Sequence, residues 1–123
     1  MSDLYEYLKP DFSFSDERGF LYQLCREGWK QVNVSQTIKG TFRGGHYHKQ
    51  TKEAFFIVSG EVEVTLEKDK QIEKQTFKKG DFFMILPFVV HSFDFKDDTL
   101  MVALYDIGVE KMDGSKDIFK RGE

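Results

Sequence analysis

Apolar residues recur at every second position along most of this chain, which is the period of a β-strand with two different faces. The segment Val62–Leu66 shows the pattern most clearly, because its apolar residues alternate with glutamate and threonine. Such alternation predicts strands with one buried face and one face in water. The candidate strands are 12–14, 20–24, 31–38, 54–58, 62–66, 71–77, 82–86, 89–95 and 100–107.

Short polar segments that contain glycine, lysine or aspartate separate these strands and predict turns. Turns are expected at 16–19, 59–60, 68–70 and 79–81. The turn at Ser59-Gly60 is expected to join its two flanking strands as a β-hairpin. Many short strands at close spacing, with almost no helix, predict an all-β barrel or sandwich.

The two ends of the chain depart from this pattern. One helical turn is expected over Asp3–Leu8, and the polar segment 110–123 is expected to form a tail or a short helix. The length of 123 residues fits one domain, with a barrel over about 11–108 and a C-terminal tail over 109–123. A hydrophobic content of 40%, with 13 phenylalanines, supplies a core that needs no disulfide bonds.

Charge and cysteine content limit which classes of binding partner and which cellular compartment we expect. The net charge is −3 and the basic residues are scattered, so nucleic acid is not an expected partner. The only cysteine, Cys25, cannot form an internal disulfide, which agrees with a reducing compartment. The first ten residues do not resemble a signal peptide, and the longest apolar stretch, 82–90, is too short to span a bilayer. We therefore expect a cytoplasmic protein with no membrane partner.

The chain has three histidines, and their positions suggest chemistry. His46 and His48 lie two residues apart, so on a strand both imidazoles would point to one face. His91 is in phase with the apolar residues of its strand, and Glu53 opens an apolar strand. Burying that carboxylate is costly unless it is paired or bound to a cation. These residues alone fit either hydrogen-bonded core side chains or a metal site.

The segment Gly40–Gly60 resembles the first conserved motif of the cupin superfamily. The motif is a glycine, five residues, His-x-His, a short spacer, a glutamate, six residues and a glycine. Here Gly40 is followed by five residues, then His46 and His48, then four residues and Glu53, and then six residues before Gly60. Every fixed position of this motif is present.

The second cupin motif is matched less completely. Gly80 and His91 keep the expected separation, but the proline is displaced by one position, at Pro87. Phe88 stands where a turn glycine is usual, and Phe95 stands where an asparagine is usual. The resemblance implies a small double-stranded β-helix, the jelly-roll barrel of cupins. It also implies one bound divalent metal ion, Zn, Mn, Fe or Ni, with these ligands: His46, His48, Glu53 and His91.

The resemblance extends over about Phe14–Ile107. The sequence Asp16-Glu17-Arg18-Gly19 is similar to a segment of nucleotide-sugar epimerases of the dTDP-4-dehydrorhamnose 3,5-epimerase type and of sugar 3,4-ketoisomerases. The sequence around Arg43–His48 resembles the C-terminal cupin domain of the CapF-type capsular polysaccharide enzymes. This implies a homodimeric epimerase or isomerase that acts on a nucleotide-linked 4-keto-deoxy sugar in polysaccharide biosynthesis.

The resemblance also implies residue roles. His46 corresponds to the base of the epimerases, a role that competes with metal binding because a coordinated imidazole is a poor base. Tyr105 is a candidate acid, and Arg18 and Arg43 are candidates for binding the substrate's phosphates. For Arg18 a plain surface ion pair is an equal alternative. Two other functions stay open, an Fe(II)-dependent dioxygenase and a non-catalytic cupin that binds a sugar or metabolite.

Overall fold

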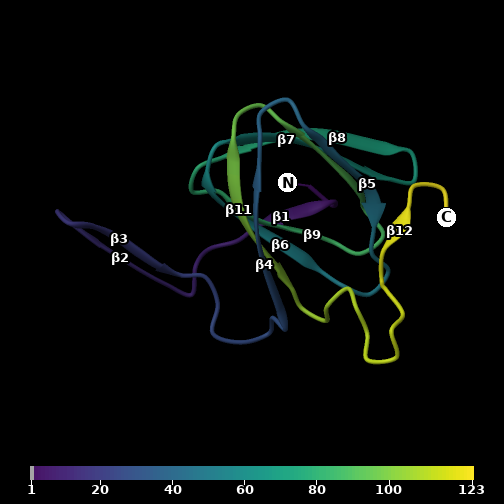
Figure 1. Ribbon diagram of the computed structural model, residues 1–123, viewed down its shortest axis with the longest axis horizontal. Coiled ribbons are helices and arrows are strands. Elements are labelled where there is room, and N and C mark those ends of the chain that lie inside the picture. The colour runs from purple at the N-terminus through teal and green to yellow at the C-terminus, as the bar shows by residue number, and fades with distance from the viewer. Residues whose placement is uncertain (1) are drawn as a thin grey trace.

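The computed structural model describes residues 2–123, and over these residues the chain forms twelve β-strands and no helix. Two five-stranded antiparallel sheets face each other and enclose the core (Figure 1). This confirms the all-β prediction. The strands are β1 Tyr5–Tyr7, β2 Phe12–Asp16, β3 Gly19–Gln23, β4 Gln31–Thr37, β5 Phe42–Tyr47, β6 Glu53–Ser59, β7 Glu61–Lys68, β8 Gln71–Lys78, β9 Phe82–Ile85, β10 Val90–Phe95, β11 Thr99–Tyr105 and β12 Phe119–Lys120.

Strands that are distant in sequence lie side by side in both sheets. The first sheet has the order β1-β9-β6-β11-β4, and the second has the order β12-β5-β10-β7-β8. The remaining pair, β2 and β3, forms a separate two-stranded sheet. Consecutive strands often belong to different sheets, as β6 and β7 or β10 and β11 do. The chain therefore crosses the barrel repeatedly, and residues from both sheets meet inside it.

The core lies between the two sheets and follows the period-two pattern. Along β10, His91, Phe93 and Phe95 are buried, while the alternating residues are partly exposed. The rings of Phe77 and Phe83 stack across the barrel interior with centroids 3.6 Å apart. Strands with one dry face therefore close around a core of aliphatic and aromatic side chains, as the alternation predicts.

The predicted hairpin at Ser59-Gly60 is wrong. Strand β6 pairs with β9 and β11, whereas β7 pairs with β8 and β10, so the chain passes here from one sheet to the other. Gly60 has φ +100°, and a Cβ at this position would lie 2.7 Å from Cα of Thr99 and closer still to the carbonyl oxygen of Asp98. The crossing needs a glycine because the β10–β11 turn lies directly against its backbone.

The expected helical turn over Asp3–Leu8 is also wrong, because Tyr5–Tyr7 forms strand β1 at the edge of the first sheet. Strand β9 offers this segment an open row of backbone hydrogen-bonding groups, and Leu4 fills the core beside it. Six residues are too few for a helix to form on its own strength. Tertiary pairing therefore decides the structure of this segment.

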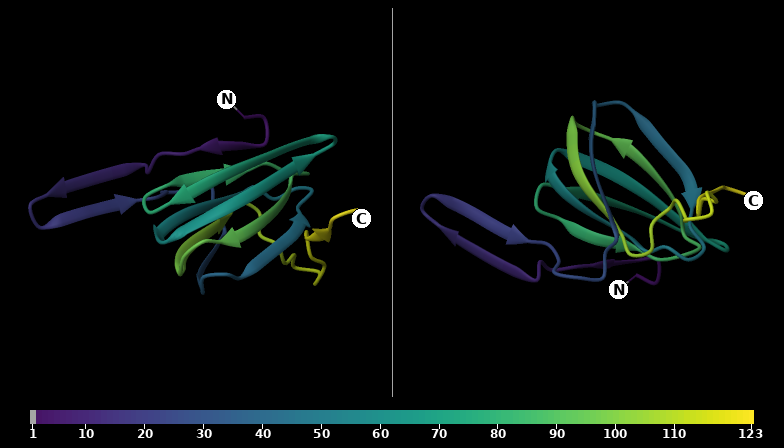
Figure 2. Two further views of the ribbon diagram at one scale, coloured as in Figure 1. Left: turned by 90° about the horizontal axis from the view of Figure 1, so that it is seen from above. Right: turned by 60° about the horizontal axis from the view of Figure 1, so that its bottom comes forward.

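The hairpin of β2 and β3, which we call the arm, extends away from the barrel (Figures 1 and 2). Its turn at Glu17-Arg18 agrees with the turn predicted at 16–19. Both of its faces carry exposed apolar side chains: Phe12, Phe14, Phe20, Leu21 and Tyr22. In residues 2–123 the structure has no helix long and apolar enough to cross a membrane.

The crossing at Gly60 gives a prediction about stability. In Gly60→Ala the new methyl group meets backbone atoms and adds left-handed backbone strain, so unfolding should be easier by about 3 kcal/mol or more in total. Gly80→Ala is a matched control, because Gly80 has φ +90° but open space where its Cβ would stand. It should cost only about 1–2 kcal/mol. Urea unfolding measures both values, and equal losses would contradict the close-approach argument.

Candidate functional site

A cavity of about 630 Å³ opens between the two sheets and contains most of the chemically active side chains. That volume is typical of a small-molecule site. The polar residues that line it are Gln31, Asn33, Ser35, Arg43, His46, His48, Glu53, His91 and Tyr105. A larger groove of about 740 Å³ lies beside β1, but none of the three histidines lines it. The smaller cavity is therefore the candidate site.

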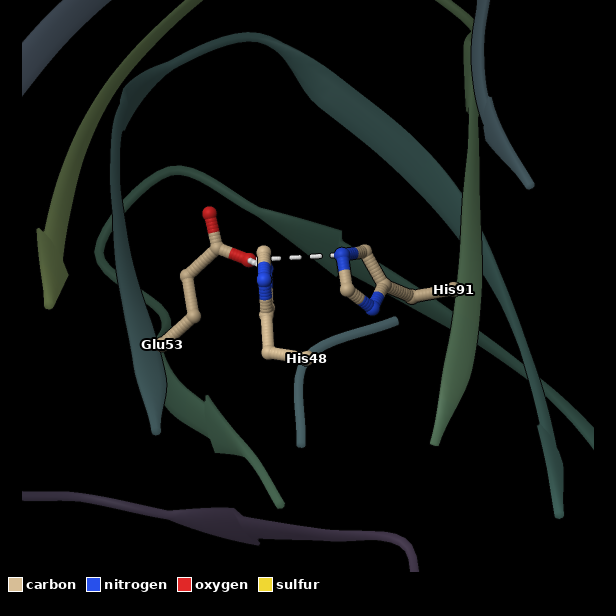
Figure 3. A group of neighbouring side chains, drawn as sticks. All are labelled: His48, Glu53 and His91. Atoms are coloured by element: carbon tan, nitrogen blue, oxygen red, sulfur yellow. Dashed lines mark hydrogen bonds and ion pairs between the residues drawn. The ribbon is translucent and has the colours of Figure 1, made fainter. Parts of the chain in front are cut away.

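Three of the four expected ligands meet at one point in this cavity (Figure 3). His48 follows β5, Glu53 begins β6 and His91 lies in β10. Nε2 of His48 is 3.1 Å from Oε1 of Glu53, and Nε2 of His91 is 3.3 Å from the same oxygen. All three side chains are about 95% buried.

The far nitrogen of each imidazole has a backbone partner. Nδ1 of His48 lies 2.6 Å from the carbonyl oxygen of Asp117, and Nδ1 of His91 lies 3.1 Å from that of Val89. A carbonyl oxygen only accepts hydrogen bonds, so both Nδ1 atoms carry the proton and donate it. Each neutral imidazole then directs its Nε2 lone pair at a carboxylate oxygen. Such a cluster of acceptors needs a positive charge, either protons on the imidazoles or a cation.

The electrostatics of the cluster agree with this requirement. Burial alone would raise the pKa of Glu53, but hydrogen bonds and attraction from His48 and His91 outweigh it and hold that pKa at about 2. Burial would lower the pKa of His48, and Glu53 with Asp117 outweighs that effect and raises it. The carboxylate is therefore ionised and favours any cation placed between these side chains.

The donor set fits a divalent metal ion. Two imidazole nitrogens and one carboxylate oxygen lie within 4.8 Å of one another, and three protein ligands with an open position are typical of catalytic metal sites. The Nδ1–H bonds to backbone carbonyls are the usual outer support of metal-binding histidines. His48, Glu53 and His91 would hold the ion.

His46 lines the same cavity but lies outside this cluster. It is opposite His91 in the pairing of β5 with β10, so the two side chains share the inner face of the sheet. His46 is only partly buried. Gly44, two residues earlier, has φ +125°, and its missing Cβ lets β5 approach the backbone of His91 and Ser92. This close approach brings His46 alongside the cluster.

Tyr105 stands on the other side of the cluster. It is opposite Glu53 in the pairing of β11 with β6, and its ring lies edge-on to His48 with centroids 6.3 Å apart. Burial, followed by the charge of Glu53, raises the pKa of its phenol well above the ordinary value. Tyr105 therefore stays protonated and can act as a proton donor in the cavity.

The two arginines differ in their relation to the cavity. Arg43 is exposed and lines the cavity from β5. Arg18 lies at the tip of the arm, where its guanidinium contacts Asp16 with Nη2 2.6 Å from the carboxylate. Within one chain, Arg18 therefore does not line the cavity with the other candidate residues. Its observed state is the surface ion pair given above as the alternative.

No pattern in the sequence predicts that the C-terminal segment reaches this site. Val109 and Ile118 line the cavity, and Asp117 bonds to His48. Asp117 lies in a polar stretch with no periodic pattern, so only the three-dimensional contacts reveal its place. Segment 110–123 therefore belongs to the wall of the cavity, and β12 within it is a strand rather than the expected tail or short helix.

Residues 14–106 match the family described as the polysaccharide biosynthesis C-terminal domain. The match spans more than half of the chain, so the chain belongs to this family. Among curated proteins we found no match.

Solved structures show the same fold at low sequence identity. The sugar 3,4-ketoisomerase QdtA from Thermoanaerobacterium thermosaccharolyticum, in complex with TDP, has a TM-score of 0.80 at 18% identity, covering 99% of this chain and 90% of that one. The TDP-quinovose 3,4-ketoisomerase WlaRB from Campylobacter jejuni has a TM-score of 0.77 at 18% identity, covering 94% of each chain. The dTDP-4-dehydrorhamnose 3,5-epimerase from Sulfolobus tokodaii has a TM-score of 0.69 at 20% identity, covering 82% of this chain and 74% of that one. These likenesses confirm the cupin-type barrel.

Proposed function

We propose that this protein is an epimerase or isomerase that acts on a nucleotide-linked 4-keto-deoxy sugar in polysaccharide biosynthesis. The observation that carries the proposal is the separation of His46 from the buried cluster of His48, Glu53 and His91. His46 lines the cavity without belonging to that cluster, so its imidazole is available as a base. Membership of a polysaccharide biosynthesis family supports the substrate class.

The chemistry follows from the acidity of a C–H bond beside a ketone. His46 takes the proton from that carbon, and the electron pair moves to the ketone oxygen to form an enolate. In an epimerase a proton then returns to the other face of the same carbon. In an isomerase the proton returns to the former ketone carbon, and the hydroxyl proton on the first carbon moves to the ketone oxygen, so that the carbonyl group changes place. Tyr105 is protonated at working pH and lines the same cavity, so it supplies the second proton-transfer group.

The substrate's remaining groups need binding energy of their own. Arg43 at the cavity lining offers a guanidinium fork that suits a diphosphate. The buried cluster would hold one divalent metal ion, which supplies Lewis-acid stabilisation of the enolate oxygen when bound. Assigning His48, Glu53 and His91 to the ion and His46 to the substrate removes the competition between the roles of ligand and base.

The reaction is tested by proton exchange with solvent. The protein is incubated in deuterated water with a panel of dTDP- and UDP-linked 4-keto-6-deoxy sugars, and deuterium in the sugar is measured by mass spectrometry and NMR. We expect deuterium at C3 or C5 from an epimerase, and at C4 of the product from a 3,4-isomerase, for at least one sugar. His46→Gln should slow this exchange roughly a hundredfold or more, because it removes the base.

The control is Lys79→Gln, a change at an exposed residue of the β8–β9 turn that does not line the cavity, which should exchange at the rate of the unaltered protein. If no sugar in the panel takes up deuterium, the proposed reaction is rejected. Sugar binding without any exchange would instead favour the non-catalytic binding module.

The ligand set gives a second prediction. His48→Ala removes one of three converging ligands and should weaken zinc binding by at least about a hundredfold, since losing only an outer partner costs roughly 10- to 100-fold. His46→Ala removes an imidazole outside the cluster and should change zinc affinity little. Isothermal titration of the metal-free proteins measures both. Equal losses in the two variants would show that all four residues bind the ion.

One observation favours a second candidate function. Two histidines and one carboxylate are the ligand set of many non-haem Fe(II) oxygenases, and the cluster has this composition. The discriminating measurement is oxygen consumption by the iron-loaded protein with the same sugars. Oxygen uptake coupled to sugar oxidation would favour the oxygenase, and exchange without oxygen uptake would favour the isomerase.

The cytoplasmic location stays a prediction.

We also propose that the protein is a homodimer joined through the arm. Two-stranded hairpins are marginally stable alone, and this one pairs with neither barrel sheet. Five bulky apolar side chains on its two faces are each 41–60% exposed, which amounts to roughly 500 Å² of apolar surface. Strand β4 adds Val32 and Val34 on an open sheet edge. A second copy would cover these surfaces with an area close to the roughly 800 Å² per partner of a standard interface.

Light scattering after gel filtration tests the dimer. The unaltered protein should have twice the mass of one chain, and Phe14→Ser/Leu21→Ser, which changes two paired residues on one face of the arm, should be monomeric. Ile72→Ser is the control, because Ile72 is as exposed as the arm residues but lies on β8. A monomeric unaltered protein at micromolar concentration would rule the proposal out.

A further inference from the structure

The C-terminal segment, residues 109–123, returns to the candidate site after leaving β11. Strand β12 pairs antiparallel with β5, with Phe119 opposite Tyr47 and Lys120 opposite His46. Figure 1 shows this strand, in yellow, at the edge of the barrel beside β5. The segment thus lies along the strand that leads to His48.

Asp117 makes five hydrogen bonds between this segment and residues 48–51. The side chain is buried, and its carboxylate accepts hydrogen bonds from the backbone N–H groups of Lys49, Gln50 and Thr51 at 2.9, 3.0 and 2.8 Å. The hydroxyl of Thr51 lies 2.8 Å from the same carboxylate. The backbone carbonyl of Asp117 accepts a hydrogen bond from Nδ1–H of His48 at 2.6 Å. One residue therefore contacts four consecutive positions.

These four positions begin the loop that separates His48 from Glu53. Residues 49–52 lie outside the sheets, so their backbone N–H groups need other partners. Asp117 accepts from three of them, and Asp106 accepts from Lys52 at 2.7 Å. Two carboxylates that follow β11 in the chain therefore set the shape of this loop, and with it the spacing of two cluster residues.

We propose that Asp117 is a positioning residue that holds Nδ1–H of His48 and thereby directs Nε2 towards Glu53. Its carbonyl orients the imidazole, and its carboxylate fixes the loop on which the imidazole stands. The inference rests on the proposed function only for the use of Nε2 as a metal ligand, since the imidazole orientation requires no metal. If Asp117 merely stabilised the loop, its loss would lower the stability of the fold but leave the His48 ring in place.

The test compares variants of the full chain in which the side-chain hydrogen-bond acceptor at residue 117, or at a control position, is changed. Asp117→Ala removes the carboxylate, and Asp117→Asn keeps one acceptor oxygen in a side chain of the same shape. Asp113→Ala is the control, because Asp113 lies in the same segment, is exposed and accepts hydrogen bonds only within its own turn, from Ser115. Thermal unfolding of all the variants separates the effect on the site from the effect on stability.

The first measurement uses the metal-free protein and detects the imidazole directly. A hydrogen-bonded Nδ1–H that is shielded from water gives a separate downfield proton NMR signal with slow solvent exchange. The unaltered protein and Asp113→Ala should show this signal for His48. It should disappear in Asp117→Ala and exchange faster in Asp117→Asn.

The second measurement titrates Co²⁺ into the same proteins and follows its visible absorption, which depends on the ligand geometry. Asp117→Ala should bind Co²⁺ roughly 10- to 100-fold more weakly, as expected for loss of an outer support of a metal-binding histidine. Asp117→Asn should show a smaller loss, and Asp113→Ala should match the unaltered protein.

The outcomes separate this inference from the proposed function. If the unaltered protein does not bind Co²⁺, the proposed metal site fails, and the Nδ1–H signal alone decides the role of Asp117. If Asp117→Ala keeps both the signal and the affinity, or if Asp113→Ala loses them equally, the positioning role is overturned. Should Asp117→Ala fail to fold, Asp117→Asn carries the same comparison.

Discussion

The candidate site depends on one electrostatic constraint, which is that the buried carboxylate of Glu53 must be matched by positive charge. Two imidazoles approach one of its oxygens, and both have their second nitrogen committed to a backbone carbonyl. Protons on the imidazoles satisfy the carboxylate, and so would a divalent cation bound between the three side chains. Without either, the unpaired buried charge would lower the free energy of unfolding of the protein.

The topology of the barrel brings these groups together from separate parts of the chain. Glu53 begins a strand of the first sheet, and His91 lies within a strand of the second. His48 stands between them, on the loop that connects the sheets. The chain crosses between the sheets at several places, including Gly60, so polar groups from both sheets meet in an interior otherwise lined by aliphatic and aromatic side chains.

Much of this arrangement could be predicted from the sequence, because it depends on local periodicity. Alternation identified most of the barrel strands but not β1, β5 or β12. The resemblance to the cupin motifs grouped His48, Glu53 and His91, together with His46, at one site. The crossing at Gly60 could not be predicted, because a glycine between two strands looks the same whether they pair with each other or with distant partners. Asp117 escaped prediction for a related reason. Its bonds run from one side chain to backbone amides that are 66–68 residues earlier, and such contacts leave no periodic trace.

The position of His46 changes how the sequence motif should be understood. The motif groups His46 with His48, and a shared strand face supports that grouping. In the structure His48 lies beyond the end of β5, where the loop held by Asp117 directs its ring towards Glu53. His46 stays within the strand, facing the cavity beside the cluster. Two histidines on one face therefore differ because one lies on a sheet and the other on a loop with its own supports. The strand position of His46 suits a group that meets a substrate in an open cavity. The buried loop position of His48, with a hydrogen-bond partner at each ring nitrogen, suits a group that must hold its orientation.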